Sequence, residues 1–538
     1  MKSVKVVIWL MLCVMVLSAC SGGGEAVETN ASDADTSQDT ASEEEADTEE
    51  ADTTESSEPI ELNIGWSGDV AHWDPYNDPT VHQYVTGYLL YDTLIAQDLE
   101  GNFIPQLATE WSFTEDFTEW SFKLRDDVTF SNGEPFNAEC VKTSFDRLMT
   151  ETLAVSTEWK ELTDVIVVGD YEVKLIFSGP NGGVLFNTAM LPMLPAQYFA
   201  EVGVEGITIN PVGSGAFVLS DYEKGQKMEF TKRQDYWGDQ SDFDKITFYI
   251  ISEGTTRIAG LQTGDVNFAY SITPDQFAVL ADNPTFAAYE LTGTMDQTFF
   301  GVKCDEFPFD DVRVRTALSL ALDRQELVEQ VVGVGDIATS CFPKGCLGYD
   351  ESIAYPARDV ALAQQLLEES GYNGEEIVLI CPIGWYPKMQ EQAEAMIAQL
   401  SEAGFNIKLE MLEPAGYLDA RNVTGEYNLF FTAMSQPQGY PNVFLTQRVE
   451  NDANLTGYVN EHLNSLIAEA RLNADLDILQ GIYAEVNQIM TEEYAPHIWL
   501  YQYAPLSVYN ADELVLTDEA MIRDGRFHFE NIEWVGGN

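Results

Sequence analysis

The side chains that most often carry catalytic or metal chemistry are spread thinly along this 538-residue sequence. Its five histidines lie far apart, and the nearest two, His72 and His82, are ten residues from each other, which is weak support for a metal or haem site. There is no HExxH motif, no CxxC pair and no GxxxxGK[ST] phosphate loop, and Gly65-Trp66-Ser67-Gly68-Asp69 lacks the last glycine of a nucleophile elbow. We therefore expect a protein that is not an enzyme and that holds no cofactor and no metal.

The elements that position the remaining polar and aromatic groups alternate between strands and helices. Apolar residues with period two predict strands at Ile60–Trp66 and Trp120–Leu124, and Asn137 is placed to cap a helix that runs to Met149. Further along, the predicted elements are a helix at Ala357–Ser370, a strand at Glu376–Pro382, a helix at Met389–Ala403 and a strand at Asn406–Leu412. This order predicts an α/β fold with a mainly parallel sheet.

Length and charge limit the classes of function. About 480 residues remain after the N-terminal region, which exceeds the usual size of one hydrophobic core, so we expect at least two lobes. The full chain has 89 acidic and 27 basic residues and a net charge of −62. Because nucleic-acid binding needs a basic face, this balance excludes nucleic acid as a partner.

The first twenty residues have the composition of an export signal. Two lysines precede the apolar run Val6–Leu17, which is too short to span a bilayer. Leu17-Ser18-Ala19-Cys20 resembles the lipobox of bacterial lipoproteins, which implies cleavage after residue 19 and a diacylglycerol group on the sulfur of Cys20. We therefore expect residues 1–19 to be a signal peptide and the lipid on Cys20 to anchor the protein on the extracytoplasmic face of the cell membrane. Ordinary secretion with an incidental cysteine is the alternative.

Residues 20–58 follow as an acidic segment with almost nothing to bury. Fourteen acidic residues lie between Glu25 and Glu58, without a lysine or arginine. A segment of low hydropathy and high charge cannot offset the entropy of ordering, and its like charges repel, so we expect a disordered, extended tether. A spacer between the membrane and a folded domain explains most of this composition; an acidic recognition tail is the alternative.

Five cysteines remain after residue 20, and an odd number excludes complete internal pairing. They are Cys140, Cys304, Cys341, Cys346 and Cys381. Cys341 and Cys346 flank a Phe-Pro-Lys-Gly turn. Two alternatives stay open for this pair: a small-loop disulfide, or buried free thiols.

Five blocks of the sequence resemble the family 5 extracellular solute-binding proteins, the dipeptide, oligopeptide and nickel receptors of ABC importers. The blocks are Leu107–Leu148, Asn210–Gly238, Arg257–Tyr270, Phe307–Arg324 and Thr491–Tyr503. The second block carries Pro-Val-Gly-Ser-Gly and ends on Tyr-Trp-Gly, and in the first block Cys140 stands where the family usually has Asp. The blocks span nearly the whole globular region in the family's order.

The resemblance implies a two-lobe, periplasmic-binding-protein-like α/β fold with an extra subdomain inserted in lobe one. It places lobe one at 59–302, the inserted subdomain at about 101–208, lobe two at 303–500 and the return to lobe one at 501–538. The implied function is a receptor that captures peptides or related oligomers by closure of its lobes and delivers them to separate permease and ATPase subunits; we expect it to be a monomer. A receptor for a neutral oligosaccharide or another non-peptide solute, and a surface hydrolase or adhesin, are the alternatives.

The same resemblance points to ligand-binding residues in both lobes. The lobe-one candidates are Trp66, Trp73 and Tyr76, which in the family border the cleft, although each such residue is by itself more often part of a core. In lobe two, Trp385, Tyr386 and Lys388 follow a strand at a junction that faces the cleft in the family. There, Lys388 would bind a ligand carboxylate and Trp385 would stack on the ligand; a surface loop is the alternative.

A further set comes from the loop that in peptide-binding members carries an Asp for the α-amino group of the ligand. The matching stretch, Tyr427–Val449, contains no Asp or Glu. A buried ammonium without a counter-charge is costly, which argues against an ordinary free dipeptide unless another segment supplies the carboxylate. The candidates in this stretch are Met434, Ser435, Gln436, Gln438 and Tyr440, which suit a neutral ligand that forms hydrogen bonds.

Overall fold

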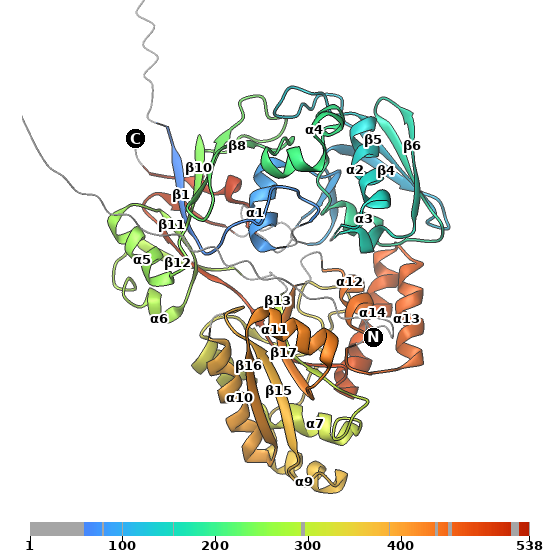
Figure 1. The fold of residues 1–538 in the computed structure, drawn as a ribbon, viewed down its shortest axis with the longest axis vertical. Coiled ribbons are helices and arrows are strands. Elements are labelled where there is room, and N and C mark those ends of the chain that lie inside the picture. Colours follow the sequence, from blue (N-terminus) through green and yellow to red (C-terminus); the bar gives the residue numbers. More distant parts are fainter. Residues whose placement is uncertain are drawn as a thin grey trace, which may run out of the picture. The chain divides into compact units, whose positions relative to one another are not determined.

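The computed structural model describes residues 59–77, 80–98, 100–153, 155–291, 296–386, 388–435, 439–449, 455–517 and 527–536. The expected signal peptide, Cys20 and the acidic tether lie outside these residues, as do Gln436 and Gln438. Among the described residues, no helix combines the length and the apolar composition needed to cross a membrane. Figure 1 shows the order of the elements along the chain.

Lobe one is built on a seven-stranded sheet. In order across the sheet, its strands are β12 (Phe286–Glu290), β19 (Leu506–Asn510), β11 (Phe268–Ile272), β1 (Glu61–Trp66), β10 (Lys245–Ile250), β9 (Lys227–Lys232) and β8 (Phe217–Glu223). β1 confirms the strand predicted at Ile60–Trp66, and both of its neighbours run parallel to it. Helix α1 (Val81–Leu90) packs against β8 and α5 (Gly254–Thr263) against β11, which the short helix α6 (Pro274–Phe277) follows.

The inserted subdomain of lobe one has its own antiparallel sheet, in the order β4 (Ala108–Phe113), β5 (Glu119–Leu124), β7 (Glu172–Phe177) and β6 (Leu162–Gly169). Helix α2 (Ala138–Thr150) packs against β6, and the predicted cap is confirmed because the Asn137 side chain accepts a hydrogen bond from the Glu139 N–H at 2.9 Å. Cys140 is buried in this helix. The other short elements of lobe one are β2 (Ile95–Gln97) paired with β3 (Phe103–Pro105), η1 (Ser156–Trp159), α3 (Val184–Thr188), α4 (Ala196–Ile209), η4 (Phe529–Asn531), and β20 (Leu514–Val515) paired with β21 (Glu533–Trp534).

Lobe two is built on a six-stranded sheet. Its strands, in order, are β14 (Asp336–Ile337), β18 (His497–Tyr503), β13 (Asp296–Val302), β17 (Leu429–Ser435), β15 (Glu376–Pro382) and β16 (Asn406–Leu412). β15 runs parallel to both neighbours, whereas β13 pairs antiparallel with β17 and β18, and β14 with β18. The prediction of a mainly parallel sheet is therefore wrong. Helical crossovers make strands parallel, but β13 and β18 are where the chain enters and leaves this lobe, so they run in opposite directions.

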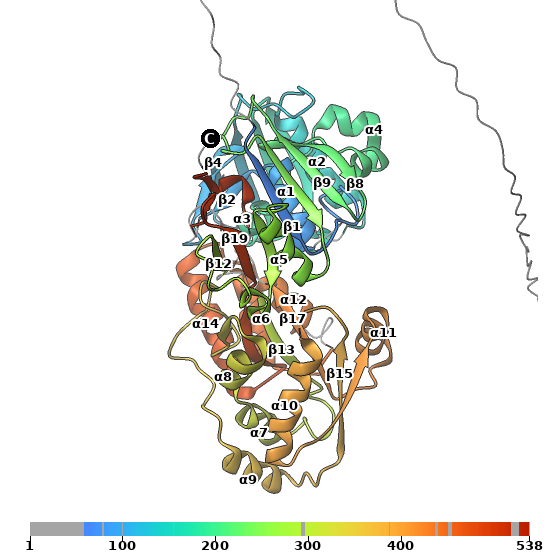
Figure 2. The same ribbon diagram turned by 90° about the vertical axis from the view of Figure 1, so that its left-hand side faces the viewer.

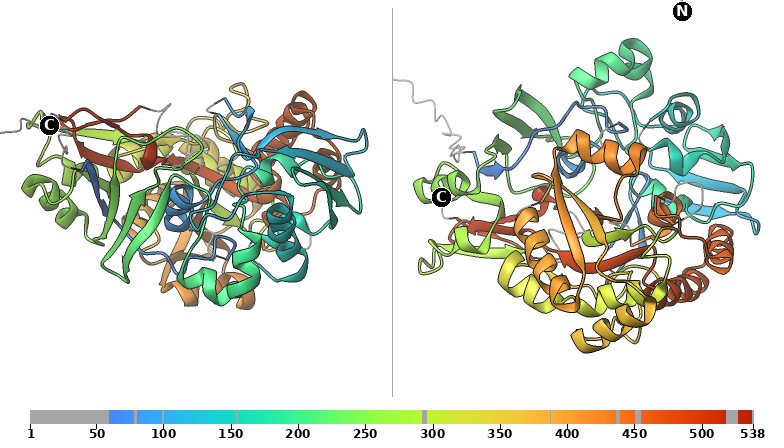
Figure 3. Two further views of the ribbon diagram at one scale, coloured as in Figure 1. Left: turned by 90° about the horizontal axis from the view of Figure 1, so that it is seen from above. Right: turned by 60° about the horizontal axis from the view of Figure 1, so that its bottom comes forward.

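Helices cover both faces of the six-stranded sheet. Successive strand residues point to opposite faces, so Phe300 and Phe299 on β13 enter different cores. Phe300 shares its core with α7 (Val312–Ala321), α9 (Val360–Ser370) and α10 (Met389–Ala403). Phe299 shares its core with α11 (Pro414–Asp419), α12 (Asn442–Arg448), α13 (Glu461–Arg471) and α14 (Leu476–Glu493). Figure 2 shows α10 and α11 on opposite sides of β15, and the right-hand view of Figure 3 brings this lobe forward. The short elements α8 (Arg324–Glu326), η2 (Leu327–Val332) and η3 (Ala420–Thr424) complete the lobe.

The five described cysteines are free thiols. Cys341 and Cys346 are both buried, and burial raises the pKa of each thiol. Of the two alternatives left open for this pair, the structure therefore has the free thiols.

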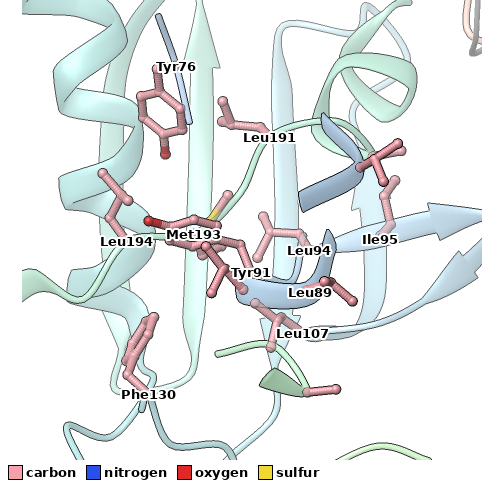
Figure 4. Close-up of a cluster of buried hydrophobic side chains, with 14 of the residues drawn as sticks. Tyr76, Leu89, Tyr91, Leu94, Ile95, Leu107, Phe130, Leu191, Met193 and Leu194 are labelled. Atoms are coloured by element: carbon pink, nitrogen blue, oxygen red, sulfur yellow. The ribbon is translucent and has the colours of Figure 1, made fainter. Parts of the chain in front are cut away.

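The loop after β1 is fixed to the inserted subdomain by a buried ion pair. The two guanidinium nitrogens Nη1 and Nη2 of Arg147 donate to the two carboxylate oxygens of Asp74 at 3.1 and 3.0 Å, and both side chains are at most 2% exposed. Burial alone would raise the pKa of Asp74, but the hydrogen bonds and charge of Arg147 outweigh burial and hold it below its ordinary value. Tyr76 lies two residues further on, within the core around α1 that Figure 4 shows with Leu191 and Met193.

We predict that Asp74→Ala destabilises the protein by about 3 kcal/mol, the lower end for a broken buried pair, because the buried Arg147 charge then keeps only Glu151, at 3.0 Å, as its carboxylate partner. Chemical denaturation followed by tryptophan fluorescence measures the free energy of unfolding. Since the pKa of Asp74 is lower in the folded than in the unfolded chain, the difference from wild type should be full at neutral pH and shrink as the pH falls below the ordinary range of aspartate.

The matched control is Glu110→Ala, which removes the acid of an exposed pair with Lys123 whose side chains are 61% and 67% exposed. It should cost less than about 1 kcal/mol. Equal losses in the two variants would contradict the assignment of the buried pair as the stabilising one.

Candidate functional site

The predicted lobe-one residues are all packed into protein. Trp66, at the end of β1, has its ring centroid 4.2 Å from that of Tyr270 on β11. Trp73 packs edge-on against aromatic rings of β8 and β9, and the Tyr76 hydroxyl donates to the carbonyl of Pro192 at 2.6 Å. All three side chains are at most 2% exposed. The structure thus places Trp73 and Tyr76 in the core of lobe one, and Trp66 next to a tyrosine that approaches lobe two.

Trp385 and Tyr386, the aromatic candidates after β15, make different contacts. Trp385 is 36% exposed, and its ring meets that of Tyr417 edge-on at 5.1 Å. Tyr386 is half-buried, and its ring lies 6.1 Å from that of Tyr503 at the end of β18. Trp385 therefore presents surface to solvent, whereas Tyr386 points toward the strand by which the chain leaves the lobe.

Lys388 makes a contact between the lobes. Its ammonium forms an ion pair with Asp275 of α6 in lobe one at 3.0 Å and donates to the carbonyl of Val331 at 3.2 Å. Asp275 is 79% exposed, so the pair is worth at most about 1 kcal/mol. A ligand carboxylate at Lys388 would have to compete with this partner.

Tyr270, Tyr386 and Tyr503 gather where the two lobes join, and we call them the interlobe tyrosine cluster. Asp296, the first residue of β13, pairs in register with Tyr503. Burial raises the pKa of all three phenols, to about 12 for Tyr503, and the Asp296 carboxylate raises them further. The three hydroxyls are therefore neutral hydrogen-bonding groups at physiological pH.

Sequence reasoning missed Tyr270, Tyr503 and Asp296. Tyr270 is the last residue of the third family-like block and Tyr503 the last of the fifth. The signal for both tyrosines is their position, since each ends a block at a strand that reaches the junction between the lobes. Nothing in the sequence indicated Asp296.

A cavity of about 330 Å³ lies in lobe two beside this cluster. Gln297 and Gln502, the neighbours in sequence of Asp296 and Tyr503, line it and face each other across β13 and β18. Gln297 is 1% exposed, and no hydrogen-bond donor contacts its Oε1 within the described part of the chain. Because a buried amide oxygen without a partner is costly, this wall suits a ligand that donates a neutral hydrogen bond.

A second contact between the lobes involves the inserted subdomain, and we call it the insertion contact. Tyr440 of lobe two stacks on Phe186 of α3, with 4.1 Å between ring centroids and 4° between ring planes. The N–H of Gly182 donates to the carbonyl of Arg471 at 3.0 Å. A Cβ atom on Gly182 would lie 1.4 Å from the carbonyl oxygen of Asn473, so only glycine allows the two segments to approach this closely.

Of the remaining candidates in this stretch, Met434 is the one whose side chain the structure describes, and it packs against the core that contains Tyr440. Met434 lies on β17, opposite Gln297 in register, and packs against the core beneath α11–α14. The backbone of Ser435 ends β17, but its side chain lies outside the described residues, as do Gln436 and Gln438.

Two carboxylates from other parts of the chain lie near residues 427–449, which carry no acidic side chain of their own. Glu158 of η1 lies near Tyr440 and Arg471; burial raises the pKa of Glu158, and the Arg471 charge opposes this rise. Asp296 approaches at the interlobe tyrosine cluster. Within the described ranges, no group of three or more His, Cys, Asp or Glu side chains is placed to hold a metal ion. The arrangement provides stacking surfaces and hydrogen bonds, which is the chemistry of binding.

Comparisons with known proteins cover most of the chain. The family model described as "Bacterial extracellular solute-binding proteins, family 5 Middle" matches residues 102–454. The nickel-binding periplasmic protein of Escherichia coli K12 is 27% identical over 425 residues, which cover 73% of this chain and 78% of that protein. The periplasmic oligopeptide-binding protein OppA of Haemophilus influenzae is 26% identical over 472 residues, which cover 81% of this chain and 86% of that protein.

Solved structures show the same fold. The structure of NikA from Brucella suis in complex with Fe(III)-EDTA superposes with a TM-score of 0.80 at 22% identity, over 88% of this chain and 99% of that chain. This likeness confirms the two-lobe α/β fold expected from the sequence.

We predict that Gly182→Ala opens the insertion contact, because its Cβ would overlap the Asn473 carbonyl. Overpacking of this kind costs about 1–3 kcal/mol, so the radius of gyration from small-angle X-ray scattering should increase relative to wild type.

Gly179→Ala is the matched control in the same loop, because nothing lies within 4 Å of its Cβ position. It should leave the scattering curve unchanged. If both variants scatter like wild type, the close approach at Gly182 does not hold the lobes together.

Proposed function

The chain belongs to the family 5 bacterial extracellular solute-binding proteins, and we propose that it is the receptor of an ABC importer for peptides or related oligomeric solutes. Members of this family are binding proteins of transport systems and not enzymes, which leaves the hydrolase alternative without support. The observation that carries the proposal is the interlobe tyrosine cluster, in which side chains from both lobes meet beside the two strands that connect them.

Capture would proceed by closure of the lobes around these strands. The chain passes between the lobes just before β13 and just after β18, and these strands are neighbours in one sheet. Two adjacent connections form a hinge, which is the usual device for enclosing a ligand between lobes. The insertion contact and the Lys388–Asp275 pair would then be contacts of the closed state.

The ligand class follows from charge and hydrogen bonding. The relatives named above bind nickel or oligopeptides, as their names state. In this chain, residues 427–449 carry no acidic side chain, and Glu158, the carboxylate near Tyr440, already faces Arg471. The cavity lined by Gln297 and Gln502 adds uncharged amides, and its lining also holds one acid and one base, Asp336 and Lys344. These features favour a blocked peptide, and they also support the second candidate, a neutral oligosaccharide. The ligand-binding residues that we propose remain Trp66, Trp73, Tyr76, Trp385, Tyr386, Lys388, Met434, Ser435, Gln436 and Tyr440, with Tyr270 and Tyr503 added.

We further propose the lobe boundaries expected from the sequence, with one adjustment. All strands of the inserted sheet fall within 101–208, and β19 returns to the first sheet after 501. β13 pairs only within the six-stranded sheet, which favours a boundary before Asp296 rather than after residue 302.

The N-terminal region would anchor the receptor. We propose that residues 1–19 are cleaved, that Cys20 carries the lipid and that the acidic segment to residue 58 extends a monomeric receptor from the membrane that holds its permease. Two acyl chains make a firm anchor where one binds only marginally. The tether would raise the local concentration of receptor at the permease.

We predict that N-acetylation of a bound peptide does not weaken its binding. The full chain should be purified under native conditions, the bound solute identified by mass spectrometry, and the peptide and its acetylated form compared by calorimetry. Loss of an ammonium that was paired with a buried carboxylate would cost about 2–5 kcal/mol, at least roughly thirtyfold in Kd.

A loss of that size would show that a carboxylate binds the amine. Asp296→Asn and Glu158→Gln would then identify which of the two does so. A protein that binds no peptide and no oligosaccharide across broad libraries, and whose scattering never changes, would overturn the receptor assignment itself.

We predict that Cys20→Ala abolishes metabolic labelling by a fatty-acid analogue and releases the protein from the membrane fraction. Cys13→Ala, in the apolar run that cleavage removes, should keep both the label and the membrane association. Labelling of the Cys20 variant would contradict lipid attachment at this sulfur.

A further inference from the structure

A separate cavity of about 260 Å³ lies in lobe one, and every residue that lines it belongs to that lobe. The end of α1, the β2–β3 pair, the loop at 236–239 and the C-terminal segment 528–531 surround it. We call it the lobe-one cavity. Its walls combine aromatic rings and carboxylates, and none of these residues belongs to the proposed peptide site.

Aromatic rings form the first part of this wall. Tyr88 stacks on His528 with 4.5 Å between ring centroids and 22° between ring planes, and Tyr236 lies 5.5 Å from Trp237. The faces of such rings attract cations. Trp237 already shows this behaviour, because the Arg125 guanidinium, which does not line the cavity, lies 4.4 Å from the centre of its ring.

Carboxylates form the second part of the wall. Asp92 is 5% exposed and accepts hydrogen bonds from the Trp237 Nε1–H at 2.8 Å and the Tyr236 hydroxyl at 3.1 Å, both neutral donors. Burial raises the pKa of Asp92, while its hydrogen bonds and the charge of Arg233 oppose that rise. Glu530 and Asp239 line the same cavity.

Basic groups balance these acids only from outside the lining, where the charge of Arg233 acts on Asp92. Among the described residues that line the cavity, there is no lysine or arginine. Arg125 is paired with Asp127, and Arg233 with Asp235 and backbone carbonyls. His528 is the one titratable base in the wall, and its Nδ1 contacts the Glu530 carboxylate at 3.0 Å. Glu530 and Asp239 by themselves outnumber the one imidazole, so the wall carries negative charge in either protonation state of the histidine.

We propose that the lobe-one cavity binds a small organic cation with a quaternary or methylated ammonium group. Aromatic faces and carboxylates together recognise such groups, since the rings contact the methyl surface while the acids balance the charge. The volume suits a compact molecule and is too small for an oligomer. This site goes beyond the proposed function, because it needs neither lobe closure nor a peptide.

Titration calorimetry with choline on the full chain tests the proposal, with 3,3-dimethylbutan-1-ol as the probe that has the same shape and no charge. We expect saturable binding of choline at least about tenfold tighter than that of the alcohol. Tyr88→Leu, which keeps bulk but removes the ring, should weaken choline binding about fivefold.

Two further variants separate charge at the cavity from charge elsewhere. Asp239→Asn removes one carboxylate of the wall and should weaken choline binding, whereas Asp419→Asn removes an exposed carboxylate in lobe two and should not. Gly182→Ala should leave choline binding intact even if it abolishes capture of the transported solute, so the two proposals fail separately. Equal binding of choline and the alcohol, no binding of either to folded protein, or wild-type affinity in Tyr88→Leu would each overturn the proposal.

Discussion

The pairing of β13 with β18 is the constraint on which the arrangement of the lobes depends. Thr298 and Tyr501 are 203 residues apart in sequence, yet the Thr298 hydroxyl donates to the Tyr501 carbonyl across this pair at 3.2 Å. Both strands reach the edge of lobe two together, where Asp296 pairs with Tyr503. The lobes are thus joined by two adjacent segments, which favours rotation about one axis. Tyr503 of the interlobe tyrosine cluster lies on β18, and the cavity residues Gln297 and Gln502 lie on β13 and β18. The register of this strand pair therefore determines where these side chains meet.

Basic side chains are scarce in this chain. Against 89 acidic residues there are 27 lysines and arginines, and several of the arginines are buried with their donors on backbone carbonyls. Arg324 donates to Trp499 at 2.8 Å, Arg315 to Phe309 at 2.8 Å and Arg257 to Ser271 at 2.6 Å. These bonds satisfy carbonyls that would otherwise be buried without a donor. Basic side chains used in this way are fully engaged with the backbone of their own lobe.

Local signals in the sequence predicted local structure well. The cap at Asn137, the strand at β1 and the alternation of helices and strands after residue 357 all depend on nearby residues, and the structure has them. The direction of β13 depends on a partner 200 residues away in the chain, so periodicity could not show that it runs antiparallel. The candidate site was harder still. By type, Trp73 and Tyr76 fit a core as well as a binding site. The buried Asp74–Arg147 pair fixes their loop to α2, and no pattern in the sequence indicates that pairing.

The insertion contact separates two properties of a receptor that are usually linked. Phe186 and Gly182 belong to a subdomain that shares no strand with either main sheet, and they touch lobe two far along the chain from the hinge strands. In the proposed closure, residues near β13 and β18 would contact the solute, whereas the hydrogen bond from Gly182 to Arg471 would hold the lobes together. Under that proposal, a substitution at Gly182 would change how long a solute stays bound and leave the residues that select it untouched.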